Sequence, residues 1–309
     1  MSVVRIDNPE SIKKLSEFIN DEKALKVTNK VLSDTKNLKE DDKRFITYMA
    51  ISYALKKIIP EKKYKKLVID IDKEVSDNKN LLGNQYKENN KYVCTFTTNN
   101  TELLGTKDVY DIIDNLATYG HELYHTKQQI DASEEKITLE SFMYSLERVL
   151  QRNLPEFYKR EYDNLFFEIE ADVVGITTAL EFLEVTGRID KVQLVKLKEY
   201  ILKHLRPNYK NIEDDEYLKN HIRKLLKKLR DYIEFFNKDF FIEYPILKYL
   251  VDRNGELESP ERLQELIDNT MHIRNNEDSK QRLRLLKILK ELSIERKKSS
   301  SYGGVKWKN

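Results

Sequence analysis

The chain has 309 residues, and its 55 Lys and Arg nearly balance its 53 Asp and Glu, so the net charge of +2 indicates no general preference for nucleic acids or membranes. No stretch approaches the about 18 apolar residues that cross a bilayer, and the polar segment Met1–Glu10 lacks the apolar core of a signal peptide. The 8 Gly and 6 Pro predict long helices with short connections, in a mainly α (α+β) fold. The single cysteine, Cys94, excludes an internal disulfide, so we expect a cytoplasmic protein.

Residues 1–60 are expected to form an N-terminal helical region that serves as a scaffold. Apolar residues at helical spacing predict helices at about 8–20, 22–34 and 41–59. Asn8 and Pro9 have the residue types that begin a helix, and Pro60 ends the third one.

Short strands are expected after Pro60. Residues 67–71 and 91–98 have the β-branched density of strands, and residues 81–86 are expected to pair with 91–98 through a turn at 88–90. Cys94 is interpreted as a small buried residue of this strand. Alternation alone does not show whether residues 91–98 lie at the edge of the sheet or inside it.

The pattern His121-Glu122-Leu123-Tyr124-His125 is the clearest chemical signature in the chain. Upstream apolar residues from Val109 to Ala117 recur at helical spacing, and Asp108 is a suitable first-turn acid. Side chains four residues apart share a helix face, so both imidazoles can reach one metal ion while Glu122 flanks it as a general base. The competing interpretation is a helix with two chance histidines.

A catalytic zinc ion needs a third protein ligand. Glu168 and Asp172, four residues apart on a second predicted helix, predict one metal ligand and one carboxylate that hydrogen-bonds a zinc-binding imidazole. Glu170 is the rival third ligand, although it fits the helical face less well. Gly175, about one turn after Asp172, is expected to let another helix approach closely.

These two motifs resemble those of the gluzincin metallopeptidases. The form Glu168-x-x-Ala171-Asp172 is similar to the soluble domains of CAAX prenyl protease and HtpX-type peptidases and to minigluzincins, over about residues 90–180. The resemblance implies a zincin-like core with one Zn²⁺ per chain, held by His121, His125 and Glu168, with Mn, Co or Ni as ions that can replace it. It also implies an oxyanion donor after the third ligand, for which the candidates are His204, Tyr209, Tyr217 and His221. In such families an edge strand before the motif helix binds an extended substrate, so residues 91–98 are the candidate for this strand, with an ordinary core strand as the alternative.

The rest of the chain is predicted to be helical. After the motif helix we expect helices at 137–153, about 155–185, 191–205, 213–237, 242–253, 260–271 and 277–297. The expected division is an N-terminal region (1–60), a catalytic core (61–187), a C-terminal helical region (188–298) and a flexible tail (299–309). The basic amphipathic stretch 219–230 is interpreted as a solvated helix face, with a surface for an acidic partner or nucleic acid as the alternative.

The sequence therefore predicts a zinc metallopeptidase that hydrolyses peptide bonds through zinc-activated water, with Glu122 as general base. Its expected partner is a peptide or a single dedicated protein, with no membrane partner and no nucleic acid. The alternative is a non-catalytic helical binding or regulatory protein that retains the metal site.

Overall fold

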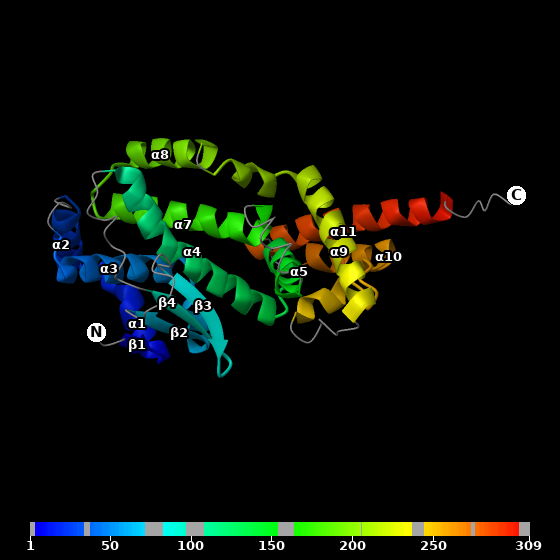
Figure 1. Ribbon diagram of the computed structural model, residues 1–309, viewed down its shortest axis with the longest axis horizontal. Coiled ribbons are helices and arrows are strands. Elements are labelled where there is room, and N and C mark those ends of the chain that lie inside the picture. The colour runs from blue at the N-terminus through cyan, green and yellow to red at the C-terminus, as the bar shows by residue number, and fades with distance from the viewer. Residues whose placement is uncertain are drawn as a thin grey trace, which may run out of the picture. The chain divides into compact units, whose positions relative to one another are not determined.

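The computed structural model describes residues 4–33, 38–71, 83–96, 108–153, 164–204, 206–236, 244–272 and 276–302; the side chains at 40, 83–85, 153, 234–236 and 299–302 are outside this description. Long helices dominate, and the strands form one small mixed sheet (Figure 1). The predicted mainly α fold with a small sheet is confirmed.

The chain divides into two compact units that interleave along the sequence. Unit 1 contains Met1–Ile130 and Ile169–Tyr209, and unit 2 contains Asp131–Glu168 and Lys210–Asn309. Both divisions fall inside continuous helices, α4 (Val109–Ser133) and α7 (Phe166–Val185). The units therefore do not coincide with the consecutive regions 1–60, 61–187 and 188–298 that were expected.

The helices of unit 1 begin where the sequence indicates. Asn8 Oδ1 accepts the N–H of Glu10, and Asp108 Oδ1 accepts the N–H of Tyr110, so both residues cap the helix that follows. Besides α4 and α7, the helical segments of this unit are α1 (Pro9–Glu17), the short 3₁₀ helix η1 (Phe18–Asn20), α2 (Glu22–Ser33), α3 (Glu40–Ile58), η3 (Glu61–Lys66) and α8 (Lys191–His204).

The sheet of unit 1 has the strand order β1-β2-β4-β3. β2 (Leu67–Ile71) pairs antiparallel with β1 (Val4–Ile6) and parallel with β4 (Lys91–Phe96). β3 (Gly83–Glu88) and β4 form the expected hairpin, whose turn residues Asn89 and Asn90 have φ values of 48° and 62°.

The position of β4 corrects one expectation. Since β4 has a strand on each side, its backbone groups are already paired and residues 91–96 do not form a substrate-binding edge. Residues 97 and 98 lie outside the described residues. Within the described part of the chain, the edges of the sheet are β1 and β3.

The sheet packs against α4. The rings of Phe96 and Tyr119 meet edge to face, with centroids 5.5 Å apart, and both side chains are fully buried. On α3, Thr47 Oγ1 lies 3.1 Å from the hydroxyl of Tyr119. Helix α4 is thus held by the sheet and by α3, and this packing fixes the helix that carries the His121–His125 motif (Figure 1).

Unit 2 is built from helices around a leucine-rich core. Residues 242–253 were predicted to be a helix; the described residues from 244 on instead form the short 3₁₀ helix η7 (Pro245–Tyr249), followed by a bridge between Val251 and Leu257, and 242 and 243 lie outside the described residues. The other helices are α5 (Leu139–Asn153), α9 (Asp215–Phe236), α10 (Pro260–Met271) and α11 (Glu277–Tyr302), and η6 (Pro207–Ile212) precedes α9.

Two predictions, for the C-terminal tail and for the helix at about 155–185, fall partly on residues that the structure does not describe. Helix α11 continues to Tyr302, so residues 299–302 of the expected flexible tail are helical, and residues 303–309 are outside the described residues. Residues 155–163, expected to be helical, are also outside it. In the described residues, every helix is too short or too polar to cross a membrane.

Candidate metal centre

The two motif histidines project from the middle of α4 toward the same point. Their Nε2 atoms lie 2.9 Å apart, and their rings are perpendicular with centroids 4.5 Å apart. His125 is buried, while the side chain of His121 is 17 % exposed. The spacing of four residues on the helix therefore brings both imidazoles together, as predicted.

The Nδ1 atom of each imidazole has an acceptor beside it. Asp172 Oδ1 lies 2.9 Å from Nδ1 of His121, and Gln128 Oε1 lies 2.8 Å from Nδ1 of His125. Because an ionised carboxylate and an amide oxygen only accept hydrogen bonds, both Nδ1 atoms carry the proton. When both rings are neutral, each presents the lone pair of its Nε2 atom to the other.

Two lone pairs facing each other at 2.9 Å repel unless a proton or a metal ion lies between them. Metal-binding histidines commonly donate their second ring N–H to a carboxylate or carbonyl, which fixes the tautomer and the ring orientation. The arrangement of His121 and His125 has both properties, so it fits a bound metal ion.

Glu168 supplies the third donor. One ligand atom from each of His121, His125 and Glu168 lies within 4.8 Å of the others, and Glu168 is buried. Two imidazole nitrogens and one carboxylate oxygen form a donor set that suits zinc and leaves a position for water. Within the described residues, these are the side chains that come together closely enough to hold a metal ion.

Glu170, the rival third ligand, has a different role. Its Oε2 accepts a hydrogen bond of 3.2 Å from Nε2 of Gln128. This bond orients the Gln128 amide so that its oxygen faces His125. Glu170 therefore supports the residue that positions His125, and the geometry favours Glu168 as the ligand.

A close approach of α4 and α7 in unit 1 positions this chemistry. A Cβ atom added to Gly175 would lie 2.5 Å from the carbonyl oxygen of Ala117 and 3.2 Å from Cβ of His121. One added to Gly120 would lie 3.0 Å from Cα of Gly175. The expected role of Gly175 is confirmed, and because Asp172 lies about one turn earlier on α7, its carboxylate reaches His121.

Asp172 is itself held in place by an arginine that the sequence analysis did not identify. Arg206 Nε lies 3.2 Å from Asp172 Oδ2, and another nitrogen of its guanidinium lies 3.6 Å from Asp114 Oδ1. Burial raises the pKa of Asp114, although Arg206 opposes this effect. Arg206 thus orients Asp172, which in turn orients His121.

In unit 2, a buried carboxylate secures the beginning of α7. Glu147 of α5 accepts the N–H groups of Phe166 and Phe167 at 2.9 and 3.1 Å, and Nε2 of His221 lies 2.7 Å from its Oε1. The side chain of Glu147 is fully buried. A carboxylate at a helix N-terminus satisfies N–H groups that have no partner within the helix, and here it fixes the turn that contains Glu168.

A second side chain of α5 also acts on Glu168. Burial disfavours the charged form of Arg148, but the Tyr144 hydroxyl and the Glu168 carboxylate outweigh this effect and raise the pKa of Arg148. The guanidinium lies over the ring of Phe167, with 4.8 Å between its central carbon and the ring centroid. The positive charge of Arg148 therefore lies near enough to the Glu168 carboxylate for the two groups to attract each other.

Glu122, the expected general base, lies half-buried on α4. Burial raises the pKa of Cys94 well above its usual value, and the negative charge of Glu122 raises it further. The carboxylate is therefore close enough to β4 to act on Cys94. Cys94 is fully buried, as predicted, and at neutral pH its thiol is protonated.

The four candidate oxyanion donors lie in different surroundings. In unit 1, the ring of His204 lies beside that of Tyr200, with centroids 4.8 Å apart and the planes tilted by 38°, and Tyr209 packs against the apolar core. In unit 2, Tyr217 stacks on His221, whose Nε2 faces Glu147. The structure thus gives His221 a place in the support of α7.

Sequence reasoning missed Gln128, Glu147, Arg148 and Arg206. Gln128 had a usable signal, because it lies three residues after His125 on the same helix and so shares its face. Arg206 and Glu147 are far from the motifs in sequence, and only the packing of the chain brings them to Asp172 and to α7.

Comparisons of the chain with protein-family models, with curated proteins and with solved structures find no match.

Proposed function

We propose that this protein is a zinc-dependent peptidase whose metal ion is held by His121, His125 and Glu168. The observation that carries the proposal is the pair of Nε2 atoms 2.9 Å apart, each on a ring whose Nδ1 is already bonded, with a carboxylate oxygen of Glu168 nearby. This set of donors and supporting hydrogen bonds is the one that catalytic zinc sites use.

A bound zinc ion would lower the pKa of water toward neutrality and polarise the carbonyl of a peptide bond. Glu122, next to His121 on α4, takes a proton from the attacking water and delivers it to the leaving amine. Asp172 and Gln128 keep the imidazoles in the Nδ1–H tautomer throughout. Arg206 holds Asp172 in an ion pair, so Asp172, Gln128 and Arg206 together keep the two imidazoles oriented.

The substrate class that fits this proposal is a peptide or a protein segment. The free edges of the described sheet are β1 and β3, and an extended peptide can pair with a free edge strand. The fully buried thiol of Cys94 needs no oxidising compartment, and we place the activity in the cytoplasm.

The test compares the unmodified protein with Glu122→Gln, since a base is removed while the metal ligands remain. Zinc content is measured by mass spectrometry, and cleavage of an unfolded protein such as reduced casein is followed with and without chelator. We expect chelator-sensitive cleavage, and in Glu122→Gln an unchanged zinc content with cleavage reduced by at least about a hundredfold. Zinc without cleavage in the unmodified protein would instead support a binding protein that retains the metal site.

A further inference from the structure

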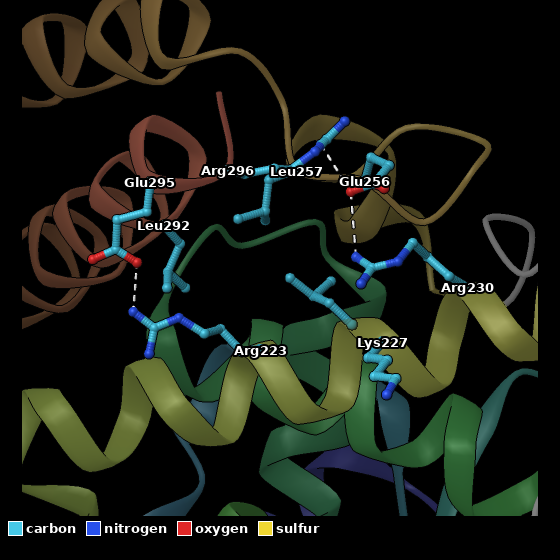
Figure 2. A pocket seen from close by; sticks show the side chains of 9 residues that line it. Arg223, Lys227, Arg230, Glu256, Leu257, Leu292, Glu295 and Arg296 are labelled. Carbon is cyan, nitrogen blue, oxygen red and sulfur yellow. Dashed lines mark hydrogen bonds and ion pairs between the residues drawn. The ribbon is translucent and has the colours of Figure 1, made fainter. Parts of the chain in front are cut away.

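Unit 2 contains a cavity of about 550 Å³ whose lining includes none of the residues of the metal centre. Its volume falls within the range of about 300–1,000 Å³ that is usual for ligand pockets. Leu226 of α9, Leu292 of α11 and Leu257, which precedes α10, form its apolar lining. Figure 2 shows Leu257 and Leu292 between two groups of ion-paired side chains.

Basic residues outnumber acidic ones around these leucines. Arg223 pairs with Glu295 at one end, and Glu256 is shared at the other end by Arg230 at 3.3 Å and Arg296 at 2.8 Å (Figure 2). Lys227 is exposed and makes no ion pair with the residues that the structure describes. Four cationic side chains thus face two carboxylates, which leaves the lining positively charged.

The cations follow one face of α9. Arg223, Lys227 and Arg230 are spaced by four and three residues, so they lie in a row, and the outer two are about 10 Å apart along the helix. This row belongs to the basic stretch 219–230, whose apolar face is buried in the core of unit 2. The solvated face of α9 therefore borders this cavity, whose apolar lining consists of leucines.

We propose that this cavity binds an acidic helical segment of a partner protein, in which an apolar side chain lies between two carboxylates. The apolar side chain enters between the leucines, and the carboxylates lie opposite the row of cations. One of them pairs with Lys227, and the other with a guanidinium N–H, because each arginine has five donors and an ion pair uses only some of them. Arginine stems add apolar contact to such an interface.

The lining argues against nucleic acid as the occupant. Glu256 and Glu295 lie among the cations and would repel phosphate groups. Among the residues that the structure describes, the side chains that line the cavity include no aromatic ring on which an unpaired base could stack. A carboxylate-bearing segment with an apolar centre matches both the charge and the leucines.

The experiment uses a fluorescent, alanine-based helical peptide of about 15 residues, long enough to form a helix. The peptide has two glutamates about seven residues apart, or two helical turns, with one leucine between them on the same face. Its anisotropy is measured on titration with the full-length protein in low salt. Peptides with both glutamates changed to glutamine, or the leucine changed to alanine, serve as matched ligands.

Charge reversal in the protein supplies the second arm. Lys227→Glu places a negative charge in the cavity, and Lys287→Glu makes the same change at an exposed position of α11 that does not line it. We expect saturable binding that weakens at least about tenfold in Lys227→Glu and with either altered peptide, a factor that corresponds to about 1.4 kcal/mol. Lys287→Glu is expected to bind within about twofold of the unmodified protein.

Three results would overturn the proposal. The first is that the acidic peptide shows no saturable binding, and the second is that Lys227→Glu and Lys287→Glu lose peptide affinity equally. The third is that a labelled DNA duplex or single strand binds more tightly than the peptide and that Lys227→Glu abolishes this DNA binding. The last result would make this face of α9 a nucleic-acid surface. Peptide binding is measured without metal and without cleavage, so its outcome is independent of the proposed peptidase activity.

Discussion

Gly175 of α7 lies directly against the backbone of α4 at His121, where an added Cβ atom would be 3.1 Å from the N atom and 3.2 Å from Cβ of His121. The absence of a side chain at Gly175 allows this close approach. Because Glu168 and Asp172 lie on the same helix as Gly175, the approach sets how far their carboxylates reach toward the imidazoles.

The first prediction concerns Gly175→Ala. Alanine favours a helix over glycine by about 1 kcal/mol, but its Cβ would lie 2.5 Å from the backbone oxygen of Ala117, which cannot move without displacing α4. We expect a net loss of about 1–3 kcal/mol in the free energy of unfolding, measured in urea, together with weaker zinc binding.

Thr177→Ala, on the same helix and half-buried, is the matched control and is expected to leave both properties within about 0.5 kcal/mol of the original. A Gly175→Ala protein that is as stable as this control and binds zinc as tightly would show that the helix contact does not position the site.

The second prediction concerns the hydrogen bond between Asp172 and His121. Asp172→Ala removes the acceptor at Nδ1 and the ion-pair partner of Arg206, so we expect zinc affinity to fall by about 10- to 100-fold. Asp172→Asn keeps an acceptor oxygen and should lose less. Competition with a zinc-binding dye measures both affinities, and equal zinc affinity in all three proteins would refute the role of Asp172.

The third prediction concerns Glu147, which is fully buried between His221 and the first N–H groups of α7. Glu147→Gln removes the charge from a buried pair, a change that typically costs about 3–5 kcal/mol. We expect the midpoint of urea unfolding to fall accordingly. Glu140→Gln, a half-buried change on the same helix, is expected to cost less than about 1 kcal/mol, and equal costs would contradict the capping role of Glu147.

The fourth prediction concerns the thiol of Cys94. Burial, reinforced by the charge of Glu122, raises its pKa, so the reactive thiolate is depleted at about pH 8, where an ordinary cysteine is substantially ionised. We expect a disulfide reagent to label the native protein at least about a thousandfold more slowly than the urea-unfolded protein, because reaction requires opening of the core. Rapid labelling of the folded protein would show that Cys94 is accessible.

Much of the fold follows from local patterns in the sequence. Helical periodicity, the cap at Asn8 and the turn at Asn89 and Asn90 depend on neighbouring residues, so the predictions made from them are confirmed. Asp108, expected in the first turn of its helix, instead precedes the helix and caps it. The prediction of a helix at 242–253 was wrong because apolar residues in this pattern fit more than one kind of secondary structure. The described part of this segment contains a short 3₁₀ helix and a residue of a β-bridge.

The supports of the candidate site depend on tertiary packing instead. Spacing along a helix brought His121 and His125 together and selected Glu168 over Glu170, but no local pattern places Arg206 beside Asp172 or Glu147 at the start of α7. The order of the strands in the sheet also depends on contacts between distant residues. The alternation of side chains along β4 therefore did not reveal that this strand lies inside the sheet.

The most direct test of the metal centre is the zinc content of the unmodified protein beside Glu168→Gln and Glu170→Gln, after loading with zinc and removal of the excess. Both variants remove one charge from the same turn of α7, and Glu170→Gln would keep a side-chain oxygen for the Gln128 amide. We expect about one zinc per chain in the unmodified protein and in Glu170→Gln, and less than about a tenth of that in Glu168→Gln. Full zinc content in Glu168→Gln, or none in the unmodified protein, would contradict a metal centre built from His121, His125 and Glu168.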